Sequence, residues 1–194
     1  MLTVISFYTN DWKYPQFAKK LIHNCEMLDI PHQIEERRST GSYLRNTCMK
    51  PRFIWEKLSE VKSPVLWIDC DGSLCAMPTF FFGLDCDMAA KRMAPTRTRT
   101  WHVGTLWVNY TPAAMEFMRR WVDNTGAISD ESALERTWRE QPINAVDIPP
   151  EYFRILQPRK FPRPGDVICH RISDGEVKRR ELPGAIKKGK AGIL

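Results

Sequence analysis

The amino-acid sequence predicts an α/β fold in which helices cover an open, largely buried sheet. The first 70 residues alternate between β-type and helical patterns in the order β-α-β-α-β, which is how a sheet with crossover helices begins. Within them, Val65 to Ile68 form a wholly apolar run, as expected for a strand buried on both faces. The chain has 194 residues, enough for one domain with its own hydrophobic core.

The elements of the first half follow from their residue patterns. Leu2 to Tyr8 is rich in β-formers and is followed by polar residues, which predicts the first strand. After Pro15, apolar residues recur at helical spacing as far as Leu28, so a helix is expected there. The remaining expectations are a strand at 32–36, a loop at 37–47, a helix from Pro51 to Leu58, and the strand at 65–68.

The second half has a weaker pattern. We expect a short helix at 79–84, a strand at 103–108, a helix that begins at Pro112 and reaches Val122, and a helix capped by Ser129 that reaches Trp138. Segment 154–165 is rich in proline and is expected to be irregular, whereas 166–169 is apolar enough for a last strand. No internal repeat or linker divides the chain.

The composition is that of an ordinary globular protein, with 43% hydrophobic and 27% charged residues. No run approaches the roughly 20 apolar residues that span a bilayer. The apolar start, Met1 to Tyr8, lacks a basic leader and a cleavage site, so it is interpreted as a strand. We therefore expect a cytoplasmic protein whose six scattered cysteines are free thiols.

The net charge of +6 favours an anionic partner, such as a nucleotide sugar, a nucleic acid or an acidic surface. Much of the excess lies in residues 176–194, which are expected to form a basic C-terminal tail. A solubilising end and a contact to a polyanion are both compatible with that segment.

The strongest chemical signal is Asp69-Cys70-Asp71, directly after the apolar strand. Open α/β sheets place their ligands at the carboxyl ends of the strands. Residues separated by one point the same way along a strand, so both carboxylates could reach one cation. Carboxylate oxygens suit Mg²⁺ or Mn²⁺, and such a cation would neutralise the charge on a leaving diphosphate.

Two enzyme families carry a motif of this kind. One is the GT-A glycosyltransferases, in which an apolar strand ends in D-x-D. The other is the haloacid-dehalogenase-type phosphatases, whose first motif resembles Asp69-Cys70-Asp71-Gly72-Ser73 and would make Asp69 a nucleophile. In the phosphatases that motif normally follows the first strand, and a later lysine and acidic pair are needed. Here Lys160 and Asp166 are crowded together and no second acid follows, so the phosphatase remains the alternative.

The glycosyltransferase resemblance extends from about residue 2 to residue 172. Its other motifs, in chain order, are Phe7-Tyr8-Thr9, Lys50-Pro51, Pro78, the run from Trp101 to Asn109 that resembles a G-x-x-x-x-N strand, Ser129-Asp130-Glu131-Ser132-Ala133-Leu134, and Val167-Ile168-Cys169-His170. The segment around Asp130 resembles the family's D-Q-x-A-L helix start, with Glu131 in place of the usual glutamine. The order and spacing of these motifs make the resemblance specific.

The resemblance implies a single GT-A-like domain, residues 1–175, with a Rossmann-like N-terminal half and a central mixed sheet. It implies a Mn²⁺ or Mg²⁺ ion held by Asp69, Asp71 and His170. The expected donor is a nucleotide-diphosphate sugar, and retaining transfer is favoured. The implied donor-binding residues are Tyr8, Thr9, Arg45, Lys50 and Asp69, and the implied catalytic residues are Asp130, Glu131 and Asn109.

The acceptor is left open by the sequence. The loop from Lys91 to His102 carries Arg97 and Arg99 and could bind donor phosphates or an anionic acceptor, with DNA, another polyanion and a protein as candidates. A third hypothesis is a non-catalytic nucleic-acid-binding protein that uses this loop and the basic tail. A second D-x-D, Asp85-Cys86-Asp87, lacks a long apolar strand before it, and Asp87 is therefore expected to be structural.

Overall fold

The computed structural model describes residues 2–94, 100–126, 128–157 and 159–171. Its strands are β1 (Thr3–Thr9), β2 (His32–Arg37), β3 (Val65–Ile68), β4 (Gly72–Leu74), β5 (Met88–Arg92), β6 (Trp101–Val108), β7 (Ala145–Asp147), β8 (Arg154–Leu156) and β9 (Ile168–Arg171). Its α-helices are α1 (Tyr14–Met27), α2 (Tyr43–Thr47), α3 (Lys50–Val61), α4 (Pro112–Asn124) and α5 (Asp130–Glu140). Single 3₁₀ turns lie at η1 (Thr79–Phe81) and η2 (Pro150–Tyr152). The predicted α/β class is confirmed.

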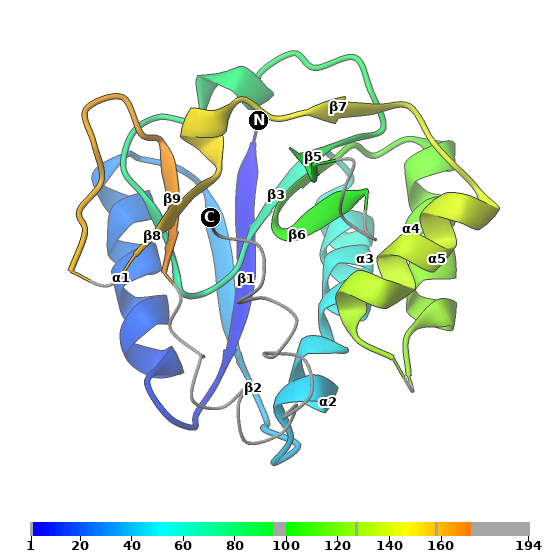
Figure 1. Ribbon diagram of the computed structural model, residues 1–194, viewed down its shortest axis with the longest axis horizontal. Helices are drawn as coiled ribbons and strands as arrows, with labels where there is room; N and C mark the ends of the chain where they lie inside the picture. Colours follow the sequence, from blue (N-terminus) through cyan, green and yellow to red (C-terminus); the bar gives the residue numbers. More distant parts are fainter. Residues whose placement is uncertain (1, 95–99, 127, 158, 172–194) are drawn as a thin grey trace.

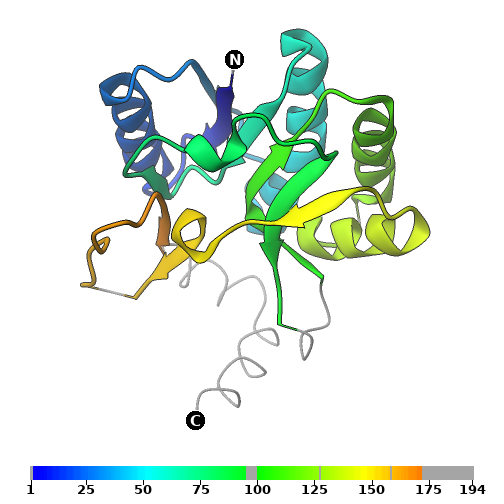
Figure 2. The ribbon, with the colours of Figure 1, turned by 90° about the horizontal axis from the view of Figure 1, so that it is seen from above.

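A six-stranded mixed sheet forms the centre, in the order β2-β1-β3-β6-β5-β7. Strand β1 runs parallel to β2 and β3, whereas β6 runs antiparallel to β3 and β5. A second sheet, in the order β4-β9-β8, was not predicted from the sequence. Helix α1 and this small sheet lie on one side of the central sheet, and α3, α4 and α5 lie on the other (Figures 1 and 2).

The two faces of the central sheet have separate apolar cores because successive strand residues point to opposite faces. Ile5 and Trp67 pack toward α3, α4 and α5, in the cluster that includes Phe117 and Trp121. Leu66 and its neighbours on the other face pack with residues of α1 and β9. The wholly buried β3 therefore lies between both cores, as its apolar run predicted.

Several boundaries differ from the sequence-based expectations for physical reasons. The expected loop at 37–47 contains the short helix α2, whose first turn is capped by the Ser42 side chain. The expected helix at 79–84 is a single 3₁₀ turn, η1. The proline-rich segment after residue 154 begins with β8 rather than irregular chain, because β8 pairs with β9. The strands β4, β5 and β7 carry too few residues for a periodic signal.

The strand directions bring three chain segments to one edge of the central sheet. Because β1 and β3 are parallel, the end of β1 lies at the same edge as the end of β3. Because β6 is antiparallel to β3, with Ile68 opposite Thr105, it is the beginning of β6 that lies at this edge. We call this the aspartate edge, since Asp69 follows β3 there.

Within the described residues, no helix combines the length and the apolar character needed to cross a bilayer. The six cysteines are free thiols, as expected.

Replacing Phe117 with alanine tests the packing of α4 on the sheet. Phe117 is 1% exposed, so its loss should lower the free energy of unfolding by about 3–5 kcal/mol in urea denaturation. The same change at Phe82, which is 53% exposed, should alter it by less than about 0.5 kcal/mol. Equal effects of the two changes would contradict the packing of this helix.

Candidate active site

The turn after β3 fixes the direction of Asp69. The Asp69 amide donates to the carbonyl oxygen of Gly104 on β6 at 2.9 Å, and the Gly72 amide donates back to the Asp69 carbonyl oxygen at 2.7 Å. A Cβ on Gly72 would lie 2.5 Å from Ile68 Cγ2 and 2.9 Å from the Asp69 carbonyl oxygen. Glycine is therefore required at position 72, where the chain turns and continues into β4 with its backbone close to Ile68 and Asp69.

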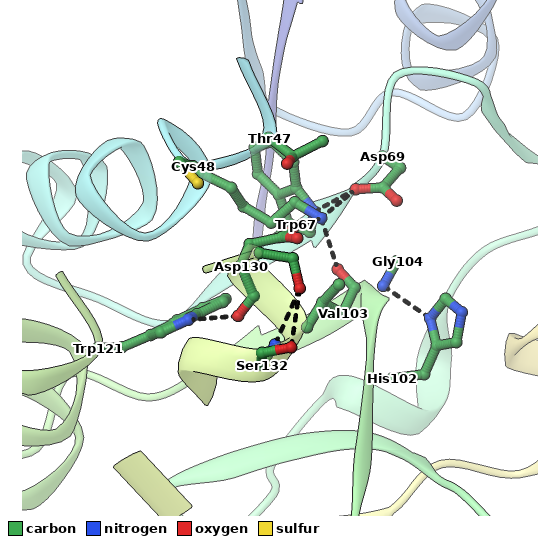
Figure 3. A network of polar contacts seen from close by, with 12 residues as sticks. Thr47, Cys48, Trp67, Asp69, His102, Val103, Gly104, Trp121, Asp130 and Ser132 are labelled. Atoms are coloured by element: carbon green, nitrogen blue, oxygen red, sulfur yellow. Dashed lines mark hydrogen bonds and ion pairs between the residues drawn. The ribbon is translucent and has the colours of Figure 1, made fainter. Parts of the chain in front are cut away.

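The buried ammonium group of Lys50 lies among three oxygens, from Asp69, Val103 and Asp130, and Figure 3 labels these three residues. Lys50 Nζ lies 2.9 Å from Asp69 Oδ1 and 2.9 Å from Asp130 Oδ2, and it donates to the Val103 carbonyl oxygen at 3.3 Å. An ammonium has three donors, so these three oxygens satisfy it. In this conformation Lys50 is paired with the two aspartates, and its expected contact with a donor phosphate stays a prediction.

Lys50 and its acidic neighbours each stabilise the charged form of the other. Burial disfavours the Lys50 charge most strongly, yet the nearby Asp130 and Asp69 carboxylates together raise its pKa above the ordinary value. Burial also works against the ionised form of Asp69, but Lys50 and then His170 outweigh it, and the pKa of Asp69 is lowered. Trp67 Nε1 donates to the same Asp69 oxygen at 2.9 Å. Asp69 is thus held ionised and in one orientation.

His170 joins the site from β9 of the small sheet. Its Nε2 lies 2.7 Å from Thr105 Oγ1, and its side chain is buried. Burial lowers the pKa of His170 to about 4, with the Asp69 charge acting in the opposite direction. The ring is therefore neutral at physiological pH, the form in which an imidazole ligates metals. Strand β9 pairs with β4, with His170 opposite Gly72.

Two residues at the beginning of β6, His102 and Gly104, complete the edge; the sequence placed them in a basic loop and in a G-x-x-x-x-N strand but did not predict their contacts with the turn at Asp69. His102 Nδ1 accepts from the Gly104 amide at 2.9 Å, so the proton of a neutral His102 ring lies on Nε2. Gly104 lies close to Asp69, since a Cβ on it would come within 3.4 Å of Asp69 Oδ2. The ring of Phe153 contacts both histidines, with centroids 4.4 Å from His102 and 5.0 Å from His170.

The fit of a divalent cation rests on the chemistry of these donors. Asp69 is ionised, His170 is neutral, and Asp71 follows Asp69 at the same edge. Carboxylate oxygen and imidazole nitrogen suit Mn²⁺. Among the described residues, no three histidine, cysteine or acidic side chains are already gathered as a closed ligand set, and Oδ1 of Asp69 is engaged by Lys50 and Trp67.

The remaining predicted donor residues lie around the same edge. Tyr8 and Thr9 end β1 there. Thr9 is buried and its hydroxyl donates to Asp11, whereas Tyr8 is partly exposed. Arg45 lies farther along, on α2, and lines a cavity beside α3.

The predicted catalytic residues are separated by the structure. Asp130 is buried against Lys50, as described, and Glu131 follows it in the first turn of α5. Asn109 follows the far end of β6, where Val108 is opposite Val65. Its side chain donates to the Cys86 carbonyl oxygen at 2.9 Å. The prediction that Asn109 faces the reaction centre is therefore wrong, because the antiparallel direction of β6 places it at the opposite edge.

Asp87 has the structural role that was predicted for it. Its carboxylate accepts from the Thr111 hydroxyl at 2.5 Å and from the Asn144 amide at 3.2 Å, tying β5 to the segments before α4 and β7. The acid proposed for a phosphatase, Asp166, is bound by Arg154 at 3.1 Å and by the Arg163 amide at 2.8 Å, and Lys160 is exposed. Arg97, Arg99 and the basic tail lie outside the described residues.

Comparisons with known proteins identify the fold. No protein-family model matches the chain, and no curated protein matches its sequence. Among solved structures, the chain is similar to a glycosyltransferase involved in glycosylating the major capsid of PBCV-1, with a TM-score of 0.68, 16% identity, and coverage of 93% of this chain and 98% of that one. It is also similar to the glycosyltransferase GlyE of Streptococcus pneumoniae TIGR4, with a TM-score of 0.58 and 15% identity.

The match to GlyE covers 89% of this chain and 55% of the other, so the chain spans about half the length of GlyE. The apo form of GlyE gives the same TM-score of 0.58, at 15% identity, covering 88% of this chain and 54% of that one. At these identities the likeness establishes the fold. The chain shares the fold of these solved structures, and the predicted α/β architecture with a central mixed sheet is confirmed.

Replacing Lys50 with methionine would leave Asp69 and Asp130 without their shared cation. We expect the free energy of unfolding at pH 7 to fall by about 3 kcal/mol, because one partner of a buried ion pair is removed. The control is Lys91→Met, which breaks a more exposed pair with Asp147 and should cost under about 1 kcal/mol.

The difference between wild type and Lys50→Met should shrink in acid. The native pKa of Asp69 is lowered from 3.8, so the stability from its ionised form is present above that value and is lost as the pH falls through the lowered native pKa. Urea titrations at pH 7 and pH 3 would measure this, and an undiminished difference at pH 3 would contradict the ion-pair interpretation.

A second pH effect should come from His170. Its native pKa of about 4 lies below the ordinary value of 6.5, so the unfolded chain binds a proton between these values that the native chain excludes. Stability from this group is complete above pH 6.5 and falls by as much as about 3 kcal/mol on going to pH 4. Replacing His170 with asparagine should flatten the pH dependence in urea denaturation. An identical slope in both proteins would show that His170 is not buried as described.

Proposed function

We propose that the chain is a glycosyltransferase that takes its sugar from a nucleotide-diphosphate donor, with a Mn²⁺ or Mg²⁺ ion at Asp69, Asp71 and His170. The observation that carries this proposal is the meeting of Asp69 and His170 at the aspartate edge, where open α/β sheets bind ligands. The glycosyltransferase fold of the two matched enzymes agrees with it.

The protein's own residues would prepare this edge for an anionic donor. Lys50 and Trp67 hold the Asp69 carboxylate in place, and Thr105 fixes the ring of His170. When bound, the cation would supply positive charge for the leaving diphosphate. Most of the remaining rate enhancement would come from positioning and from preorganised charge.

The donor base would lie beside the end of β1, at Tyr8 and Thr9, since this strand reaches the same edge as Asp69. On the other side, Asp130 and Glu131 begin α5 next to Lys50 and would face the sugar. The Asp130 carboxylate forms an ion pair with Lys50. It would therefore stabilise positive charge on the sugar and would not serve as a free base. A retaining outcome remains part of the proposal, and the anomeric configuration of the product would decide it.

The alternative hypotheses receive no specific support from the site. A dehalogenase-type phosphatase needs a lysine and a further acid beside Asp69, but the candidate Asp166 is bound by Arg154. A nucleic-acid-binding role depended on Arg97, Arg99 and the tail, which lie outside the described residues. DNA, another polyanion or a protein as acceptor therefore stays a prediction of the sequence.

An assay of donor hydrolysis tests the proposal. We expect the protein to release nucleoside diphosphate from at least one common nucleotide sugar in the presence of Mn²⁺. Replacing Asp71 with asparagine should lower this rate about 100-fold, because the amide keeps the shape but removes the charge that a hard cation requires.

The matched control is Asp85→Asn, in the second D-x-D, where the residue is exposed; this variant should keep the wild-type rate. Activity that survives both a chelator and the Asp71 change would remove the cation from the proposal. Turnover of a generic phosphomonoester that depends on Asp69 would instead support the phosphatase.

A further inference from the structure

A cavity of about 330 Å³ lies beside the first turns of α3, next to the candidate active site. Its walls come from the ends of β1 and β2, from α2 and α3, and from the end of α4 with the following turn. Cys48 and Met49 line it and directly precede Lys50. Cys48 also donates to the Ile128 carbonyl oxygen at 3.3 Å, which joins this wall to the turn before Asp130.

The cavity is strongly cationic. Three arginines, Arg37, Arg45 and Arg52, line it against one acid, Glu56. Within the described part of the chain, Arg37 pairs with Glu35 at 2.9 Å and with Glu56 at 3.8 Å, whereas no ion pair holds Arg45 or Arg52. Two guanidinium groups are therefore left to neutralise an anion.

Arg37 differs from the other two arginines. Its guanidinium lies over the Phe53 ring, 4.9 Å from the centroid, its terminal nitrogen pairs with Glu35 and Glu56, and its Nε is enclosed without a hydrogen-bond partner. An enclosed atom cannot be reached from the cavity, so the positive charge available to an anion there is that of Arg45 and Arg52.

The rest of the lining is apolar. Phe7, Met49, Phe53 and Val122 face the same cavity, whose volume is at the lower end of the range for small-molecule sites. An inorganic ion would leave these side chains without a partner. The lining therefore suits a small organic group that carries a phosphate, since guanidinium groups match phosphate oxygens in geometry and charge.

We infer that this cavity is a binding site for a phosphate monoester carried by the sugar acceptor, distinct from the donor's diphosphate at Asp69 and Asp71. The role as an acceptor site rests on the proposed glycosyl transfer, but the binding chemistry does not. Arg45, which the sequence resemblance assigned to the donor, binds the acceptor phosphate together with Arg52. An acceptor held here lies against the turn of α3 that carries Lys50, and so next to Asp130.

Calorimetry with phenyl phosphate tests the site in the full-length protein. At pH 7.5 the probe is mostly a dianion and combines a phosphate with an apolar ring. We expect it to bind with a dissociation constant below about 1 mM, with inorganic phosphate at least about fivefold weaker and phenol undetectable. Saturating UDP with Mn²⁺ should leave the affinity for phenyl phosphate unchanged, because the donor lies at the aspartate edge.

The double variant Arg45→Gln and Arg52→Gln should weaken phenyl phosphate binding at least about tenfold, and Arg45→Gln alone should give part of this loss. The matched control is Arg136→Gln, which removes an exposed arginine on α5 and should keep the affinity within about twofold. Thermal melting of each variant would confirm that it is folded.

Three results would overturn the inference: no binding of phenyl phosphate to the wild type, equal affinity in the folded double variant, or displacement of the probe by UDP, which would assign the cavity to the donor. Because calorimetry measures binding without turnover, an absence of phenyl phosphate binding can be distinguished from an absence of glycosyl transfer. Donor hydrolysis without phenyl phosphate binding would leave the enzyme standing and remove this acceptor site.

Discussion

The shared ammonium of Lys50 is the interaction on which the arrangement of the site depends. Its buried positive charge lies between Asp69, which follows β3, and Asp130, which begins α5. Burial opposes the ionised form of Asp69, and the Lys50 charge is the largest effect that offsets it, so the pKa of Asp69 is lowered. Lys50 also donates to the Val103 carbonyl oxygen, so three chain segments are fixed at one point. The first turn of α3 is therefore a structural centre of the site as well as a source of charge.

The residues of the site come from two sheets, the buried central sheet and the smaller sheet β4-β9-β8. The central sheet supplies Asp69 and the beginning of β6 on strands that are buried on both faces. The small sheet supplies His170, and β4 joins the two because it directly follows Asp71 and pairs with β9. Phe153 packs against both His102 and His170. The central sheet thus orients the Asp69 carboxylate, and the small sheet brings the neutral imidazole of His170 close to it.

The sequence predicted the elements whose own residues determine them. The apolar run of β3 and the helical periodicity of α1, α3, α4 and α5 required no knowledge of the partners. The short strands β4, β5 and β7 are defined by what they pair with, so no local pattern indicated them. The same limit applies to the site. Asp69 follows from a local pattern, but whether Asn109 or Gly104 lies beside it depends on the direction of β6, which is a property of the pairing.

The pairing of β4 with β9 has a consequence for protein synthesis. Strand β4 leaves the ribosome roughly a hundred residues before its partner, if chains fold from the N-terminus as they emerge. During that interval the acids of the site and the central strands exist, while the edge of β4 is without its partner and the histidine has not been made. A nascent or truncated chain would then expose the unpaired backbone groups of β4, and its candidate site would lack the histidine. Chaperones or proteases that recognise incomplete chains would bind at this exposed edge.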